Sequence, residues 1–63
     1  MAKQMTSKQI EIWKNKVVEY AGRMVAKFDA IEAGARVWHY YGCPTEIKDG
    51  KLVIWFGRQS VTL

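Results

Sequence analysis

The sequence of 63 residues has little cysteine and no long hydrophobic run, and it contains one cysteine, Cys43. A single cysteine cannot form an internal disulfide, which excludes the disulfide-stapled folds of small secreted proteins and favours a reducing compartment. The first residues lack the apolar run of a signal peptide, and no stretch approaches the roughly 18 apolar residues of a membrane span. We therefore expect a cytoplasmic protein without a membrane partner.

The chain also has little excess charge. Its 10 Lys and Arg residues against 6 Asp and Glu give a net charge of +4, and no block or tail dominates the balance. Such a charge permits attraction to nucleic acid or to an acidic protein, and it equally suits an ordinary soluble surface. A chain of this length buries only about 60% of the surface that its unfolded form exposes, so residues 1–63 leave room for a single small domain and for no deep enzymatic cleft.

Candidate catalytic residues are few. His39 and Cys43 are the only members of their kinds, and their spacing allows a Cys–His nucleophile pair or half of a metal site that Glu46 or Asp49 would complete. A structural zinc site normally needs four Cys or His ligands, and no glycine-rich phosphate loop is present. We therefore expect no enzyme activity, no bound metal and no cofactor.

The first part of the chain has a helical pattern. Thr6 followed three residues later by Gln9 is typical of a capping box, which predicts a helix over residues 7–33 that Gly34 ends in a left-handed conformation. Residues 1–5 are expected to be disordered. Gly22 indicates a bend, a close backbone approach or a break into two shorter helices. The predicted apolar stripe spans an arc of about 100° on the helical wheel and consists of Ile10, Trp13, Val17, Tyr20, Ala21, Met24, Phe28, Ile31 and Ala35.

Residues 36–63 have the pattern of a β-sheet. Residues 36–41 are β-branched and aromatic, and Asp49-Gly50 predicts a tight hairpin because both central residues of a type I′ turn need positive φ. This turn places Lys48 opposite Lys51 and continues to Thr45 opposite Ile54. The tail after Gly57 either extends the last strand or frays. We predict an α+β fold, with a long N-terminal helix packed on a three-stranded antiparallel β-meander.

This arrangement leaves apolar residues uncovered. A helix of about 27 residues is roughly 40 Å long, whereas a six-residue strand covers roughly 20 Å. We therefore predict a homo-oligomer, most simply a dimer, joined through the helix stripe, the outer sheet face or an edge strand. The alternative is a compact monomer with a bent helix and a curled sheet. The predicted interface residues are Ile10, Trp13, Val17, Trp38, Tyr40, Val53 and Trp55.

These patterns favour a non-enzymatic interaction protein that binds another macromolecule stoichiometrically, as a regulator, inhibitor or assembly factor. Its size suits a phage or mobile-element protein, and a protein partner is favoured over nucleic acid. In the first alternative, Trp55 or Trp38 stacks on nucleic-acid bases. The phosphate contacts would then come from Lys16, Arg23, Lys27, Lys48, Lys51 and Arg58. The second alternative is a nucleotide-like small ligand enclosed at an oligomer interface.

Overall fold

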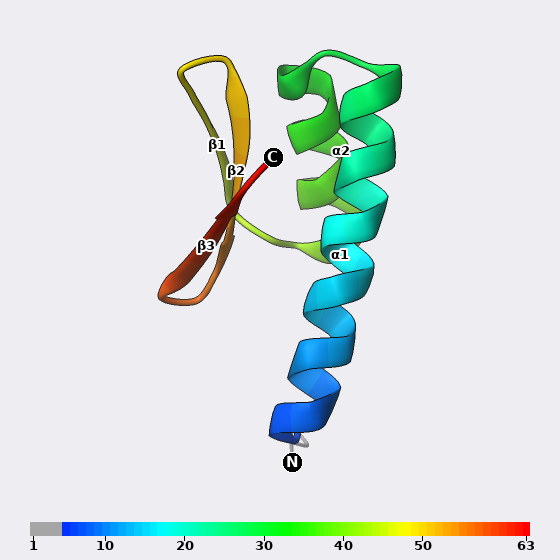
Figure 1. Ribbon diagram of the computed structural model, residues 1–63, viewed down its shortest axis with the longest axis vertical. Coiled ribbons are helices and arrows are strands. Elements are labelled where there is room, and N and C mark those ends of the chain that lie inside the picture. Colours follow the sequence, from blue (N-terminus) through cyan, green and yellow to red (C-terminus); the bar gives the residue numbers. More distant parts are fainter. Residues whose placement is uncertain (1–4) are drawn as a thin grey trace.

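The computed structural model describes residues 5–63 and contains two helices followed by a three-stranded antiparallel sheet (Figure 1). The elements are α1 (Ser7–Lys27), α2 (Ala30–Tyr41), β1 (Thr45–Lys48), β2 (Lys51–Phe56) and β3 (Gln59–Thr62). The strand order is β1-β2-β3. This arrangement confirms the predicted α+β class and the long first helix. Most of the predicted disordered segment, residues 1–4, lies outside the described residues.

Helix α1 begins as the sequence predicts. The Thr6 hydroxyl accepts a hydrogen bond from the Gln9 backbone N–H at 3.1 Å, and the Gln9 side chain accepts one from the Thr6 N–H at 2.9 Å. This reciprocal capping box satisfies two backbone donors of the first turn. The helix then continues through Gly22 without a break, and no atom lies within 4 Å of the position that a Cβ would take there. The predicted break or close backbone approach at Gly22 is therefore wrong.

The helical region is also divided differently from the predicted single helix over residues 7–33. Helix α1 ends at Lys27, and Phe28 takes an extended conformation with φ −129° and ψ 171°. Asp29 then starts α2, since its Oδ1 accepts a hydrogen bond from the Glu32 backbone N–H at 2.8 Å. Aspartate is among the best N-cap residues because its carboxylate satisfies an otherwise free N–H of the first turn. The chain consequently reverses at residues 28–29.

The cap at Asp29 gives a direct test of this reversal. Replacing Asp29 with Ala should lower the free energy of unfolding by about 1 kcal/mol, because the first turn of α2 loses the acceptor for the Glu32 N–H. Urea denaturation followed by circular dichroism measures the change. The matched Asp29→Asn variant keeps an acceptor and should lose much less. Equal losses for both variants would show that the negative charge matters rather than the hydrogen bond.

Residues 36–41, predicted as a strand, instead form the second half of α2. The spacing of Ala33, Val37 and Tyr41 matches the helical period, and these side chains are buried or half-buried against the core. Burial along this face outweighs the strand preference of the β-branched and aromatic residues. The left-handed residue that ends the helix is Gly42, with φ 67°, rather than the predicted Gly34.

Gly34 has a different role, in the middle of α2. It is buried, and a Cβ at this position would lie 3.0 Å from Leu52 Cδ1 and 3.2 Å from Thr45 Oγ1. The Thr45 hydroxyl also donates a long hydrogen bond, 3.5 Å, to the Gly34 carbonyl. The absence of a side chain at Gly34 therefore lets the backbone of α2 lie directly on the sheet.

The β1–β2 hairpin has the predicted register, from Lys48 opposite Lys51 to Thr45 opposite Ile54. Asp49 and Gly50 have φ values of 53° and 75°, as the predicted turn requires. The third strand differs from the prediction: after a turn at residues 57–58 the tail folds back and pairs with β2 as β3. The predicted extension or fraying of the tail is wrong because Gly57, at φ 68°, reverses the chain.

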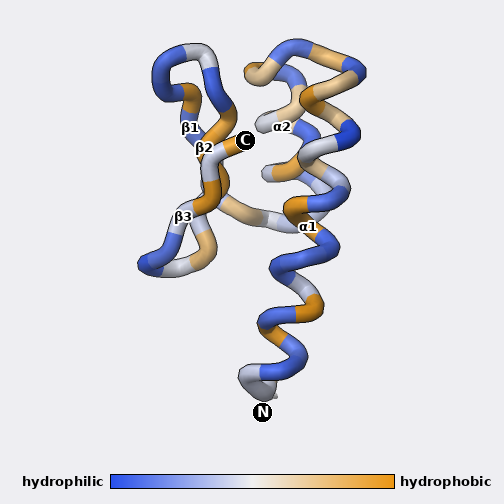
Figure 2. Tube along the Cα trace, viewed as in Figure 1, coloured by the Kyte–Doolittle hydropathy of each residue, from blue (hydrophilic) through white to orange (hydrophobic). Residues whose placement is uncertain are grey.

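Both helices lie on one face of the sheet, and the core lies between them (Figure 1). Helix α2 packs over β1 and β2, whereas α1 approaches β3, where Lys14 Nζ donates to Gln59 Oε1 at 2.8 Å. Figure 2 shows that β2 is the most hydrophobic part of the sheet and that the β1–β2 turn is hydrophilic. The buried core consists of Val17, Ala21, Ala33, Val37, Cys43, Leu52 and Ile54.

Candidate functional site

Two of the predicted interface residues belong to the interior. Val17 is fully buried in the core between α1, α2 and the sheet, and Val53 is 4% exposed. Val53 lies on the central strand, with Glu46 on one side and Thr62 on the other as cross-strand neighbours. Side chains flanked on both sides in this way lose most of their contact with water. Val17 and Val53 are therefore unavailable to a partner, and this part of the prediction is wrong.

Three other predicted interface residues, Ile10, Trp13 and Trp55, come together around one groove of about 340 Å³. The groove lies where the first turns of α1 extend past α2 and face the end of β2. Its complete lining, hereafter the aromatic groove, is Met5, Ile10, Trp13, Gly42, Cys43, Pro44, Trp55, Phe56 and Gly57. Three of the predicted residues thus line one concave site, although sequence reasoning missed the contributions of the 42–44 segment and of Phe56.

The rings of the aromatic groove are held in place by specific contacts. Trp13 and Phe56 pack edge to face, with ring centroids 5.4 Å apart and an interplanar angle of 89°. The Trp55 indole N–H donates to Glu46 Oε1 at 3.1 Å, and the Trp55 backbone N–H donates to the Pro44 carbonyl at 2.8 Å. Edge-to-face pairs and a bonded indole fix ring orientation. The aromatic walls of the groove are therefore held in fixed orientations by contacts within the chain.

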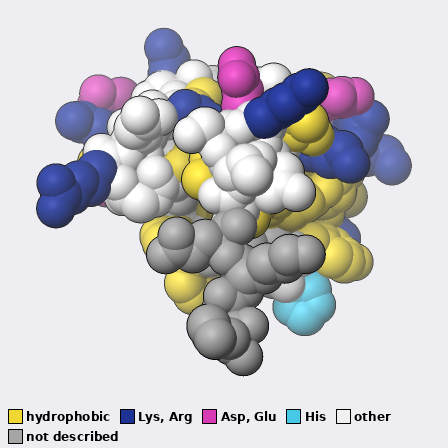
Figure 3. All heavy atoms as spheres, turned by 90° about the horizontal axis from the view of Figure 1, so that it is seen from below, with side chains coloured by type: hydrophobic (Ala, Val, Ile, Leu, Met, Phe, Trp, Pro, Cys, Tyr) yellow, Lys and Arg dark blue, Asp and Glu magenta, His cyan; other side chains and the backbone are white. Residues whose placement is uncertain are grey.

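Positive charge lies at the rim of this groove. Lys14 Nζ is 5.7 Å from the centroid of the Phe56 ring, and Arg58 is exposed in the turn next to Gly57. Figure 3 looks at the molecule from below and shows Lys and Arg side chains around the edge, together with some Asp and Glu side chains, and hydrophobic side chains further in. An apolar surface bordered by cations attracts a ligand that combines apolar groups with negative charge.

Cys43 and His39 do not form a nucleophilic pair. Burial raises the pKa of the Cys43 thiol, and its Sγ donates to the Tyr41 carbonyl at 3.7 Å. A raised pKa keeps the thiol protonated and weakly nucleophilic at neutral pH. His39 is exposed on α2, and its ring packs against Tyr40 with centroids 5.1 Å apart. Within residues 5–63, no three His, Cys, Asp or Glu side chains are grouped as metal ligands would be.

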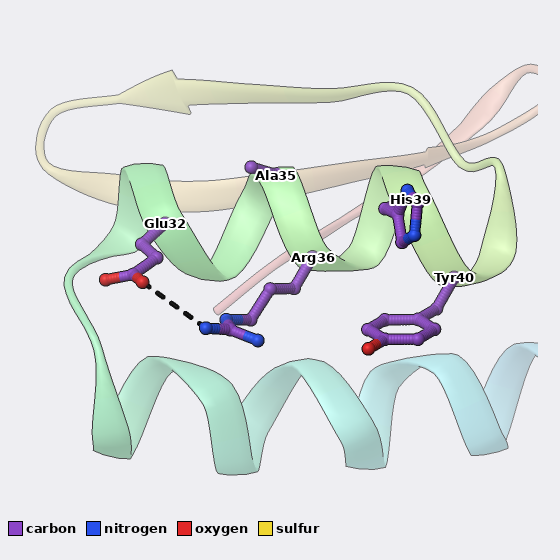
Figure 4. Close-up of a pocket in the computed structure, with 5 residues that line it drawn as sticks. All are labelled: Glu32, Ala35, Arg36, His39 and Tyr40. Carbon is purple, nitrogen blue, oxygen red and sulfur yellow. Dashed lines mark hydrogen bonds and ion pairs between the residues drawn. The ribbon is translucent and has the colours of Figure 1, made fainter.

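A second, shallower pocket of about 280 Å³ lies along α2 (Figure 4). Its lining is Glu32, Ala35, Arg36, His39 and Tyr40. The Arg36 guanidinium already pairs with Glu32 at 3.4 Å and lies 4.4 Å from the centroid of the Phe28 ring. Arg36 and Tyr40 extend from α2 toward α1 in Figure 4. The predicted interface residue Tyr40 packs on Tyr20 and does not line the aromatic groove. Because its main cation is engaged within the chain, this pocket is the weaker candidate.

The residues predicted to contact nucleic acid occupy three separate places. Lys48 and Lys51 face each other beside the β1–β2 turn, whereas Arg58 belongs to the turn at the opposite end of β2. The remaining three, Lys16, Arg23 and Lys27, are exposed along α1, and Arg23 pairs with Glu19 at 3.3 Å. Trp38 is exposed on α2, away from the aromatic groove that contains Trp55. The fold therefore does not assemble these residues into one phosphate-binding surface.

Comparisons of the chain with protein-family models, with curated proteins and with solved structures found no match. In the part of the chain that the structure describes, neither helix is long and apolar enough to cross a membrane.

Proposed function

We propose that this chain is a non-enzymatic interaction protein that binds a protein partner stoichiometrically through the aromatic groove. The partner segment is apolar and carries acidic residues beside its apolar anchors. The observation that carries this proposal is the preformed groove, in which Trp13, Trp55 and Phe56 surround an opening of about 340 Å³. A regulator, an inhibitor or an assembly factor would act in this way, because none of them needs to turn over a substrate.

The chemistry of the groove supports a protein ligand. Tryptophan and other aromatic residues dominate the energetics of protein interfaces, above all where they line a pocket that excludes water. Lys14 and Arg58 at the rim would meet acidic side chains of the partner.

Selection from a random peptide library on the immobilised full chain tests this proposal. We expect enriched peptides with aromatic or aliphatic anchors next to Asp or Glu. Replacing Ile10 with Glu should weaken their binding at least about tenfold, because the variant places a charge in the apolar lining. Titration calorimetry with a selected peptide measures this loss. The matched control is Ile12→Glu, a change at an equally exposed position of α1 outside the groove.

Three outcomes would contradict the proposal. Enriched peptides without acidic residues would show that the partner does not need negative charge. Peptides that bind the Ile10→Glu variant as tightly as the original chain would show that partner binding does not use the groove. A small molecule that co-purifies with the chain and is lost from the Ile10→Glu variant would assign the groove to the small-ligand alternative instead. The groove volume falls within the range of such sites, about 300–1,000 Å³. Nucleic-acid binding stays a prediction from the sequence.

A further inference from the structure

Of the two edges of the sheet, the edge at β1 is the better suited to pair with another strand. The Trp55 N–H donates to the Pro44 carbonyl, so residues 44, 46 and 48 direct their backbone groups toward β2. Backbone groups alternate in direction along an antiparallel strand, and the N–H and C=O groups of Thr45 and Ile47 therefore point away from the sheet. Free groups of this kind form a template for another strand.

An apolar strip borders this edge. The side chain of Ile47 faces the helices and is 43% exposed, while Ile31 and Trp38 on α2 are 72% and 56% exposed. Ile31 and Trp38 lie three residues before and four residues after Gly34, the residue that touches Thr45, so they share one flank of the helix. Helix α1 lies on the other side of α2, toward β3. The exposed flank of α2 therefore overhangs the free edge of β1.

The opposite edge of the sheet lacks this combination. Strand β3 presents the backbone of Ser60 and Thr62, because the Leu63 N–H bonds to the Leu52 carbonyl and fixes the alternation. Among the described residues, β3 contains no exposed large hydrophobic side chain. Its neighbour on α1 is Lys14, which is hydrogen-bonded to Gln59. Within residues 5–63, only the edge at β1 joins free backbone groups to an apolar strip.

The charges on β1 are complementary to a second copy of the same strand. When two copies pair antiparallel about a two-fold axis at Ile47, each Glu46 lies opposite Lys48 of the second copy. The Glu46 carboxylate is already held on this face by its hydrogen bond from the Trp55 indole. An axis at Glu46 would instead oppose two carboxylates. Opposite charges favour the first register, and like charges disfavour the second.

We infer that the protein forms a two-fold dimer in which β1 pairs antiparallel with β1 of a second copy, with Ile47 on the axis. The two sheets join into one of six strands, and Ile31 and Ile47 of both copies bury one another beneath the paired edges. Trp38 borders this apolar centre. The surface is self-complementary, as a two-fold interface requires. It does not include the aromatic groove, so each chain of the dimer keeps its partner site.

Sedimentation velocity of the full chain, from micromolar to millimolar concentration, tests the dimer. We expect a concentration-dependent species of twice the 7.3 kDa mass of one chain. Ile47→Lys should raise the dissociation constant about a hundredfold or more, because two buried side chains are lost per dimer. Circular dichroism verifies that the variant folds. Ile10→Glu should leave the dimer intact, which separates this test from that of the aromatic groove.

Charge reversal tests the register. Glu46→Lys and Lys48→Glu should each raise the dissociation constant about tenfold or more, since each opposes like charges twice per dimer. An equimolar mixture of the two single variants should form heterodimers, because every pair across the axis is then opposite in charge. The matched controls Glu11→Lys and Lys16→Glu make the same charge changes on the exposed surface of α1 and should dimerise normally.

Three results would overturn the inference. A monomer at every concentration would leave the β1 edge to a strand of a different protein. A dimer that tolerates Ile47→Lys would place the contact elsewhere on the chain. Single charge variants that dimerise as well as their mixture would exclude the register about Ile47.

Discussion

Replacing Gly34 with Val should lower the free energy of unfolding by about 2–3 kcal/mol, most of what a domain of this size possesses. The Cβ of the new side chain would lie 3.0 Å from Leu52 and 3.2 Å from Thr45, and its two methyl groups would need further space in a buried contact. Helix α2 would have to move away from the sheet. Urea denaturation followed by tryptophan fluorescence measures the loss.

Gly22→Ala is the matched control for this prediction. Gly22 is also within a helix but has no neighbour within 4 Å of a Cβ. Alanine there should raise the free energy of unfolding by about 1 kcal/mol, since it removes the entropic cost of a helical glycine. If Gly34→Val also raises the free energy of unfolding, helix propensity rather than the close contact with the sheet controls the effect at Gly34.

A comparable loss should follow truncation of Leu52, which lies fully buried between α2 and the sheet. Leu52→Ala should lower the free energy of unfolding by about 3 kcal/mol, because it removes apolar burial and leaves a cavity. At 37 °C much of the chain should then be unfolded, and the amide resonances of the native state should weaken in NMR spectra. The control Ile12→Ala truncates an exposed residue and should cost far less. Similar losses would show that Leu52 is not central to the core.

Local patterns predicted the parts of the fold that depend on a few neighbouring residues. The capping box at Thr6 and the register around Asp49-Gly50 depend on hydrogen bonds and φ values within a single turn. The reversal at Asp29 also had a local signal, an acidic residue followed three residues later by Glu32. The apolar stripe continued across residues 28–31 and obscured this signal, because periodicity alone does not mark a helix end.

Tertiary contacts decided the rest. Residues 36–41 resemble a strand in composition, but the buried face of α2 and the close contact at Gly34 hold them in a helix. The aromatic groove was partly predictable, because counting uncovered apolar residues singled out Trp13 and Trp55. Phe56 was missed since its position in the groove depends on how the end of β2 meets α1, which no local pattern reveals.

The contact between α1 and β3 bears on how the chain completes its folding. The other packed pairs of elements are close together in the sequence, as in α1 with α2, α2 with β1 and β2, and β2 with its two neighbouring strands. Contacts between segments close in sequence favour fast folding. Lys14 and Gln59 are 45 residues apart, and the Trp13–Phe56 contact beside them also joins distant segments. Closing such a long loop carries the largest entropic cost. The aromatic groove consequently exists only where the first turns of α1 have docked against the end of β2, so a partner that binds there would distinguish docked from undocked chains.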